Sequence, residues 1–135
     1  MKIIVVDDNK TFRDAIKDYL ENYLGHNVIW EGSSGEEFLD EAPAHMADII
    51  LMDIEMHRVN GIDATHAINI RVPWAKIIAV TMNIEKIFLL QLIENGFKGC
   101  VSKSEIAEKL EIALNRVNSG QLFFPNYIKI SDKLI

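Results

Sequence analysis

The sequence has a single cysteine, Cys100, so no disulfide can form within the chain and no cluster of thiolates can hold a metal. Long apolar runs are also missing, and none approaches the roughly 18 residues that a membrane span requires. The apolar run at residues 3–6 is too short for a signal peptide and ends at two aspartates. We therefore expect a protein of a reducing, cytoplasmic compartment that makes no membrane contact.

Basic residues are fewer than acidic residues in this sequence. The chain has 14 lysines and arginines against 20 aspartates and glutamates, which gives a net charge of −6. Such a surface repels nucleic acid, so we do not expect this part of the protein to contact DNA itself. The length of 135 residues suits one domain, and an apolar content of 49% is enough to build a core.

Short β-branched runs alternate with helical patterns along the chain. Strands are expected near residues 3–6, 27–31, 48–52, 76–80 and 98–101. Helices are expected near residues 11–24, after Ser33 or Ser34, at 62–70, at 84–94, and from a cap at Ser104 to about residue 117. This order predicts an α/β fold with a parallel sheet between two layers of helices. Residues 122–135, "LFFPNYIKISDKLI", match no further unit of this kind.

Polar residues follow four of the expected strands. They are Asp7 and Asp8 after the first, Asp53 after the third, Thr81 after the fourth and Lys103 after the fifth. Because the strands of a parallel sheet all end at the same edge, where ligands bind, we expect these five side chains to form one pocket.

The chemistry of this pocket favours phosphoryl transfer. Three carboxylates repel one another, and a Mg²⁺ ion that binds them relieves the repulsion. Lys103 and the Thr81 hydroxyl provide partners for phosphoryl oxygens. A carboxylate held among such groups can attack phosphorus and form an aspartyl phosphate.

Five segments in order resemble the receiver domain of bacterial two-component response regulators, over about residues 2–120. They are "VVDDN" at 5–9, "ILMDIEM" at 50–56, "NGIDAT" at 60–65, "AVTM" at 79–82 and "GCVSK" at 99–103. Each segment alone is common, but all five at these separations are specific. The resemblance implies a flavodoxin-like, doubly wound sheet of five parallel strands with about five helices.

The resemblance also assigns roles to the pocket residues. It implies that Asp53 accepts a phosphoryl group from a sensor histidine kinase, with Thr81 as the switch hydroxyl and Lys103 as the phosphate partner. It implies a Mg²⁺ cofactor bound by Asp8, Asp53 and the backbone carbonyl of Glu55, and by Asp7 through water.

Some positions depart from the common pattern. Cys100 stands where many receivers carry a switching Tyr or Phe, and His57 stands where many have Pro. Ser104 after Lys103, and "SGQLFFP" at 119–125, are similar to receivers of NarL/LuxR-type transcription factors. That similarity implies a receiver at 1–120, with 121–135 as an extension or the start of a linker to a DNA-binding output domain outside this chain.

Two other functions fit parts of the pattern. A stand-alone receiver would act through protein contacts alone. A Mg²⁺-dependent phosphohydrolase would use an aspartate nucleophile, but such enzymes place a second aspartate two residues later, where this chain has Glu55, and need a cap insertion that no connection here is long enough to hold. We therefore do not expect an enzyme with an external substrate.

Apolar residues surround the expected helix at 84–94 on all sides, which favours a partner surface such as a homodimer contact. His26, His45, His57 and His66 have no metal-ligand spacing, so surface or loop positions are expected for them.

Overall fold

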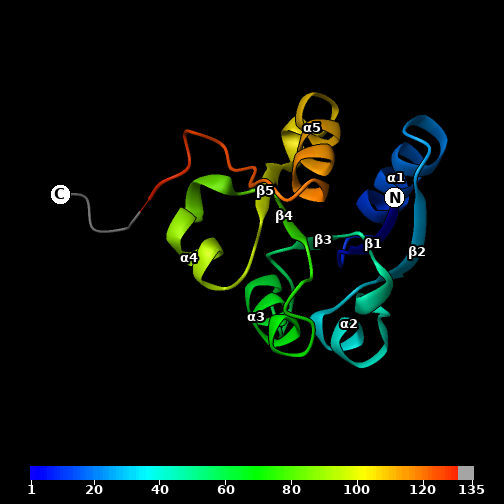
Figure 1. Ribbon diagram of the computed structural model, residues 1–135, viewed down its shortest axis with the longest axis horizontal. Coiled ribbons are helices and arrows are strands. Elements are labelled where there is room, and N and C mark those ends of the chain that lie inside the picture. The colour runs from blue at the N-terminus through cyan, green and yellow to red at the C-terminus, as the bar shows by residue number, and fades with distance from the viewer. Residues whose placement is uncertain (131–135) are drawn as a thin grey trace.

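The computed structural model describes residues 1–130. Five parallel strands form one sheet in the order β2-β1-β3-β4-β5, with helices on both faces (Figure 1). The strands are β1 (Lys2–Val6), β2 (Asn27–Gly32), β3 (Ile49–Asp53), β4 (Ile77–Thr81) and β5 (Gly99–Ser102), and the α-helices are α1 (Lys10–Asp18), α2 (Gly35–Glu41), α3 (Gly61–Arg71), α4 (Leu89–Glu94) and α5 (Ile106–Asn118). The predicted fold class is confirmed.

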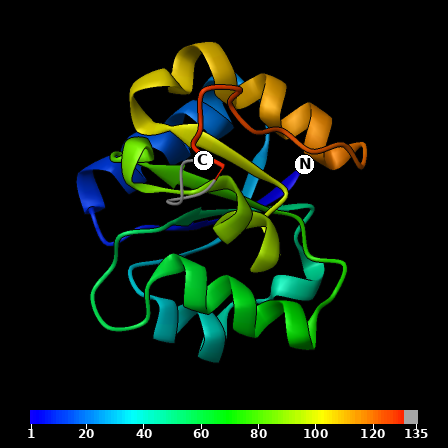
Figure 2. The same ribbon diagram turned by 90° about the vertical axis from the view of Figure 1, so that its left-hand side faces the viewer.

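Successive residues of the central strands enter opposite halves of the core, because side chains alternate across a sheet. Ile4 and Met52 pack with α2, α3 and α4, whereas Ile3 and Leu51 pack with α1 and α5. Figure 2 shows the sheet between these two layers of helices. Both faces of the central strands are therefore dry, which explains their nearly continuous β-branched sequence.

Two helix ends differ from the sequence prediction. The first helix continues past Asp18 as a π-helical stretch, Tyr19–Tyr23, before the chain turns at Gly25 with φ +77°. The predicted cap at Ser104 is wrong, because a 3₁₀ turn (Lys103–Glu105) precedes α5. Ser102 takes the capping role and accepts a hydrogen bond from the Ser104 amide at 3.3 Å.

The expected helix at 84–94 is interrupted. A 3₁₀ turn covers Ile84–Lys86, the next two residues are extended, and α4 begins only at Leu89. The Leu89 amide donates to the carbonyl of Lys129 at 2.6 Å, so a distant segment replaces the local helical bond. Local periodicity could not reveal this break.

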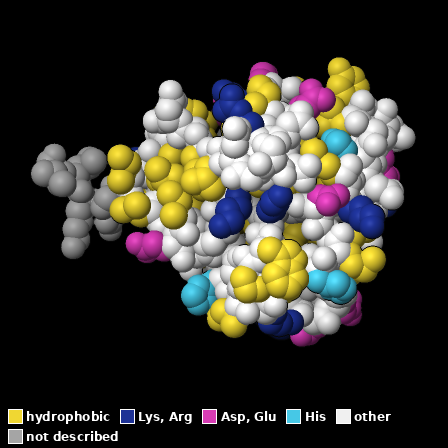
Figure 3. All heavy atoms as spheres, viewed as in Figure 1, with side chains coloured by type: hydrophobic (Ala, Val, Ile, Leu, Met, Phe, Trp, Pro, Cys, Tyr) yellow, Lys and Arg dark blue, Asp and Glu magenta, His cyan; other side chains and the backbone are white. Residues whose placement is uncertain are grey.

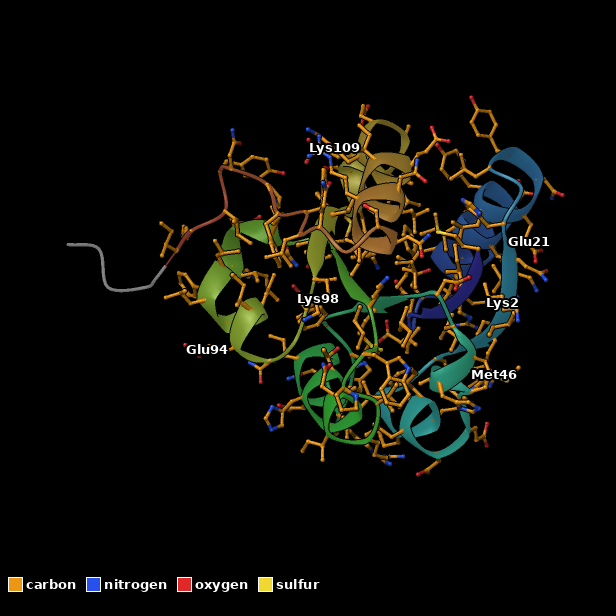
Figure 4. The ribbon with its side chains drawn as sticks, viewed as in Figure 1. Lys2, Glu21, Met46, Glu94, Lys98 and Lys109 are labelled. Atoms are coloured by element: carbon orange, nitrogen blue, oxygen red, sulfur yellow. The ribbon has the colours of Figure 1, made fainter. Side chains whose placement is uncertain are left out.

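The strand order places a crevice at one end of the sheet. The order reverses between β1 and β3, and in such sheets ligands bind beyond the carboxyl ends of the strands at this point. Lys2 and Lys98, labelled in Figure 4, lie at the amino ends of β1 and β5, opposite the crevice. No helix within residues 1–130 is both long enough and apolar enough to cross a membrane.

Candidate phosphoryl-acceptor site

Three carboxylates meet where β1 and β3 end side by side. Asp53 is the last residue of β3, and Asp7 and Asp8 follow β1 directly. One oxygen from each of the three lies within 4.8 Å of the others. Asp7 and Asp53 are buried, with 1% and 5% of their surfaces exposed, whereas Asp8 opens to solvent. The fold thus brings together the acidic residues singled out from the sequence.

Among the described residues, Lys103 supplies the only cation that forms ion pairs with these three carboxylates. Its Nζ lies 2.7 Å from Asp7 Oδ2 and 3.8 Å from Asp53 Oδ2. The ammonium also lies 4.3 Å from the centre of the Phe12 ring, a favourable cation–π contact. One ammonium against three carboxylates leaves a net charge of −2 when all four groups are ionised, so the pocket still attracts positive charge.

This surplus of negative charge changes the acidity of Asp53. Burial and the neighbouring Asp7 carboxylate raise the pKa of Asp53 from 3.8 to about 7, against the opposing effect of Lys103. Asp53 therefore lies near the midpoint of its titration at neutral pH when no further cation is bound. A cation would restore its fully ionised, nucleophilic form.

The residues present fit a hard divalent cation. Asp7 Oδ2 is buried and has no hydrogen bond of acceptable geometry to any residue within 1–130, although the Lys103 ammonium lies close to it. Asp8 and Glu55 line an open hollow of about 500 Å³ beside the cluster, which leaves room for water and a phosphoryl group. Carboxylate oxygens, a backbone carbonyl and water are the ligands that Mg²⁺ prefers.

Short-range hydrogen bonds hold Asp7 in place. The Asn9 amide donates to Asp7 Oδ1 at 2.8 Å, and Arg13 donates to the Asp7 carbonyl at 2.7 Å. Asn9 also caps α1, where its Oδ1 accepts from the Phe12 amide. Sequence reasoning missed these supports, as well as the contact between Phe12 and Lys103. An asparagine just before a helical pattern was the available signal for the cap.

The backbone of Asp53 is fixed from the opposite side by α3. A Cβ atom added at Gly61 would lie 2.0 Å from the Asp53 carbonyl oxygen, so only glycine permits this approach. The Gly61 amide donates to the carbonyl of Ile54 at 3.0 Å, and Asn60 caps the helix through the Asp63 amide. The acceptor strand and α3 are therefore in direct backbone contact.

Thr81 ends β4, the strand next to β3. Its side chain is fully buried, and its Oγ1 accepts a long hydrogen bond of 3.3 Å from the Asn83 amide. Two residues further along each strand connection, Asn83 Nδ2 donates to Glu55 Oε1 at 2.8 Å. The connections that follow Asp53 and Thr81 are thus joined across the mouth of the site.

Comparison with known proteins decides the family. The sequence model described as "Response regulator receiver domain" matches residues 3–115, which is most of the chain. The chain belongs to the response regulator receiver domain family. This receiver is accordingly a signalling domain of two-component systems, and a phosphohydrolase function is not favoured.

Curated relatives agree with this assignment. The receiver is 27% identical to the transcriptional regulatory protein DegU of Brevibacillus brevis over 135 residues, which are all of this chain and 56% of the relative. It is 32% identical to the response regulator GacA of Pseudomonas syringae over 123 residues, 91% of this chain and 58% of the relative. The chain therefore spans a little over half the length of these relatives.

Solved structures give the same subfamily. A LuxR-family two-component response regulator from Aurantimonas sp. superposes with a TM-score of 0.83 at 28% identity, covering 90% of this chain and 87% of that one. The isolated REC domain of RcsB from Salmonella enterica, solved with the phosphomimetic BeF₃⁻, gives 0.80 at 26% identity and covers 93% and 94%. The predicted similarity to LuxR-type receivers is confirmed.

Side chains outside the pocket have plainer roles. Cys100 is fully buried in the core, and burial raises the pKa of its thiol to about 12, which makes it unreactive. His45, His57 and His66 are exposed, as predicted, and His26 is partly buried beside the N-terminal amine at 3.0 Å.

Proposed function

We propose that this receiver accepts a phosphoryl group on Asp53 from the phosphohistidine of a sensor kinase. The observation that carries the proposal is one buried carboxylate held among two others with a single lysine 3.8 Å away. An ordinary surface aspartate is surrounded by water and not by two other carboxylates and a lysine. We propose Asp53 and not Asp7 as the nucleophile, because Lys103 is already paired with Asp7 at 2.7 Å and lies farther from Asp53.

In the proposed transfer step, an Asp53 carboxylate oxygen attacks phosphorus and an O–P bond forms. The P–N bond to the donor imidazole breaks, its electron pair goes to the imidazole nitrogen, and that nitrogen then takes up a proton. Lys103 moves from Asp7 toward the new phosphoryl oxygens and pairs with them. The Thr81 hydroxyl gives up its weak bond from the Asn83 amide and donates to a phosphoryl oxygen.

We further propose that Asp8, Asp53 and the Glu55 carbonyl hold Mg²⁺ directly, with Asp7 acting through water. When bound, the ion neutralises charge on the phosphoryl oxygens during transfer. Asp7 meanwhile loses its lysine partner, and the cation compensates for the charge that this buried carboxylate retains.

Return to the unphosphorylated state requires hydrolysis. Water attacks phosphorus in line with the Asp53 O–P bond, which regenerates the carboxylate and releases inorganic phosphate. The only catalysis that we propose for this domain is of its own phosphorylation and dephosphorylation.

The target that we propose for the switch is a DNA-binding output domain. RcsB, a structural neighbour, has been solved as dimers bound to DNA. We propose by analogy that this cytoplasmic receiver controls a DNA-binding output domain, to which residues 121–135 begin the linker. Residues 131–135 of that range lie outside the described part of the structure. A homodimer is the form in which we expect it to act.

Phosphorylation by acetyl phosphate tests the proposal directly. Intact-mass analysis should show one added phosphate that requires Mg²⁺ and is released by hydroxylamine, as expected of an acyl phosphate. Asp53→Asn should abolish the adduct, whereas Asp40→Asn, a change at an exposed aspartate, should leave it unchanged. An adduct that persists in Asp53→Asn would place the chemistry on another residue.

A further inference from the structure

After α5 the chain turns back along the open edge of the sheet. The Phe123 amide donates to the carbonyl of Lys98 at 3.0 Å, and the Phe123 carbonyl accepts from the Cys100 amide at 2.9 Å. Phe123 thus pairs in parallel with Gly99 on β5. Figure 1 shows this segment, in red, passing from β5 to α4. Residues 123–130 are called the strap below.

The edge of β5 is shaped for the strap. A Cβ atom at Gly99 would lie 2.9 Å from the carbonyl oxygen of Phe123, so glycine at this position allows the close approach of the two backbones. Ile128, further along the strap, is only 7% exposed and belongs to the same core cluster as Leu92 of α4. The strap is therefore an integral part of the packing and not a loose tail.

A second anchor joins the strap to the start of α4. The Leu89 amide donates to the Lys129 carbonyl at 2.6 Å, and Phe88 pairs with Lys129 as an isolated parallel bridge. This amide has no side-chain cap, because Phe88 occupies the capping position. The strap thus holds the end of the connection that begins at Thr81.

A third anchor joins the strap to the short turn that begins at Lys103. The Tyr127 hydroxyl donates to Glu105 Oε1, and this hydrogen bond raises the pKa of Tyr127 to about 12. Glu105 ends the short turn that begins at Lys103. Between the strap and α5 lies a hollow of about 240 Å³, with Lys109 on its α5 side (Figure 4). The strap therefore has space into which it can shift.

The second and third anchors lie on segments that leave the phosphoryl site. One segment runs from Thr81 to Leu89, and the other runs from Lys103 to Glu105. In the proposed function, Thr81 and Lys103 are the two groups that move toward the phosphoryl oxygens. Any such movement pulls on the strap at two points, because the strap contacts both connections.

We propose that the strap reports the state of Asp53 to the end of the chain: phosphorylation draws the two anchors toward the site and loosens the strap from Leu89. This inference rests on the proposed function and adds the route by which the signal leaves the domain. It needs no rotation of a core side chain, because the route consists of a backbone hydrogen bond to Leu89 and an exposed side-chain hydrogen bond to Glu105.

Hydrogen exchange on the wild-type domain tests the inference without any substitution. Beryllium fluoride with Mg²⁺ serves as the probe, and amide exchange is followed by NMR. The Leu89 amide should exchange about tenfold faster or more when the probe is bound, which is within the usual range of coupling between two sites. The Ile68 amide, inside α3, should not change and serves as the internal control.

Thermodynamic linkage supplies an independent test. If the bound probe loosens the strap, loosening the strap must strengthen probe binding by the same factor. Ile128→Asp removes a buried contact, whereas Ile130→Asp changes a residue that is 64% exposed. Ile128→Asp should bind the probe several-fold more tightly than Ile130→Asp. Tyr127→Phe, a change at an exposed position that removes only the Glu105 bond, should move affinity in the same direction by less.

The outcomes separate the inference from the function on which it rests. If Asp53 is phosphorylated but Leu89 exchange is unchanged or slower, and the Ile128 and Ile130 variants bind equally, the strap is a fixed part of the fold and the inference is wrong. If the mass adduct on Asp53 never forms, the proposed function fails and the inference fails with it.

Discussion

Strands β3 and β4 end side by side, yet the connections that follow them differ in how firmly they are held. After Asp53, the connection buries Ile54 and Met56 and enters an 11-residue helix with an asparagine cap. After Thr81, it exposes 66% of Met82, makes one 3₁₀ turn, and enters a six-residue helix with no side-chain cap. The site therefore has one anchored side and one weakly anchored side.

The difference teaches where a signal can go. A six-residue helix is far below the length at which helices are stable alone, so α4 depends on packing against the core and the strap. Phosphorylation at the site should therefore displace the β4–α4 connection before it displaces the β3–α3 connection. The Glu55–Asn83 hydrogen bond is the one described side-chain link between the two connections. The predictions below test this contrast.

The largest expected effect is on stability, at the anchored side. Burial and Asp7 raise the pKa of Asp53 to about 7, while its unfolded value stays near the ordinary 3.8. Between these pH values the folded state holds a proton that the unfolded state has lost, so stability decreases as pH rises through this window. From 1.36 kcal/mol per pKa unit, the full cost above about pH 7 is at most ~4 kcal/mol.

Asp53→Asn should remove this cost. Without Mg²⁺, the variant should be more stable than the wild type by about 2–4 kcal/mol at about pH 8 and equally stable near pH 4. Urea unfolding at several pH values, with a chelator present, measures the difference. Asp40→Asn serves as the control, and a wild-type curve that stays flat across this range would show that Asp53 is not under this strain.

The next effect compares two adjacent leucines on α4. Leu89 packs against the core, whereas Leu90 is 45% exposed. Leu89→Glu should destabilise the domain by about 2–3 kcal/mol, because a charge enters an apolar contact. Leu90→Glu should change stability by less than about 0.5 kcal/mol, as surface substitutions do. Chemical denaturation measures both, and equal losses would mean that α4 is buried on both sides.

Leu90→Glu is therefore suited to a test of self-association. Figure 3 shows hydrophobic side chains gathered over α4 and the strap, and the exposed members of this region are Leu90, Ile93 and Ile130. If the region is a dimer contact, the folded Leu90→Glu variant should sediment as a monomer when the wild type, loaded with beryllium fluoride, does not.

A smaller effect is expected from the cap of α3. Asn60→Ala removes a hydrogen bond of 2.9 Å to the Asp63 amide and should cost about 1 kcal/mol. The matched change at α2, Ser34→Ala, removes an equivalent bond of 3.1 Å and should cost about the same. Thermal or urea unfolding measures both. A negligible loss of stability in Asn60→Ala alone would show that this cap does not help to anchor the connection after Asp53.

The smallest effect concerns the link between the two sides. Glu55→Ala and Asn83→Ala should each change the hydrolysis rate of the aspartyl phosphate several-fold, because we propose that water reaches phosphorus past these two hydrogen-bonded side chains. If the pair acts as a unit, the double variant should match the single variants. Intact-mass analysis of the loss of phosphate over time measures these rates. Wild-type rates in both variants would show that the Glu55–Asn83 hydrogen bond does not control the lifetime of the aspartyl phosphate.

Residue patterns were enough to predict the sheet and to bring the acidic residues together. Ile49 and Ile50 are buried on opposite faces of the sheet, so their continuous apolar run indicated a strand covered on both sides. The parallel order then placed the carboxyl ends of all strands at one edge. The position of Asp53 followed from chain order alone, without knowledge of any contact.

Features that depend on distant contacts could not be predicted. Apolar residues from Ile84 to Ile93 suggested one helix, but the helix begins only at Leu89, whose amide bonds to Lys129, forty residues later. The pairing of Phe123 with Gly99 has no local signature, because a single bridge leaves no periodicity. The contact of Phe12 with Lys103 was hidden because Phe12 also fits the apolar stripe of its helix.

Gly61 determines the mechanical compliance of the site. With no side chain, it lets α3 rest directly on the Asp53 carbonyl, where a Cβ would lie 2.0 Å from the oxygen. The backbone of Asp53 is consequently held in place, so it should not move away when a new phosphoryl group exerts an electrostatic force on its surroundings. Because the connection after Asp53 is held firmly, a small force at the site should displace the weakly anchored connection after Thr81. Gly61, a residue that touches no ligand, thereby sets which part of the domain moves.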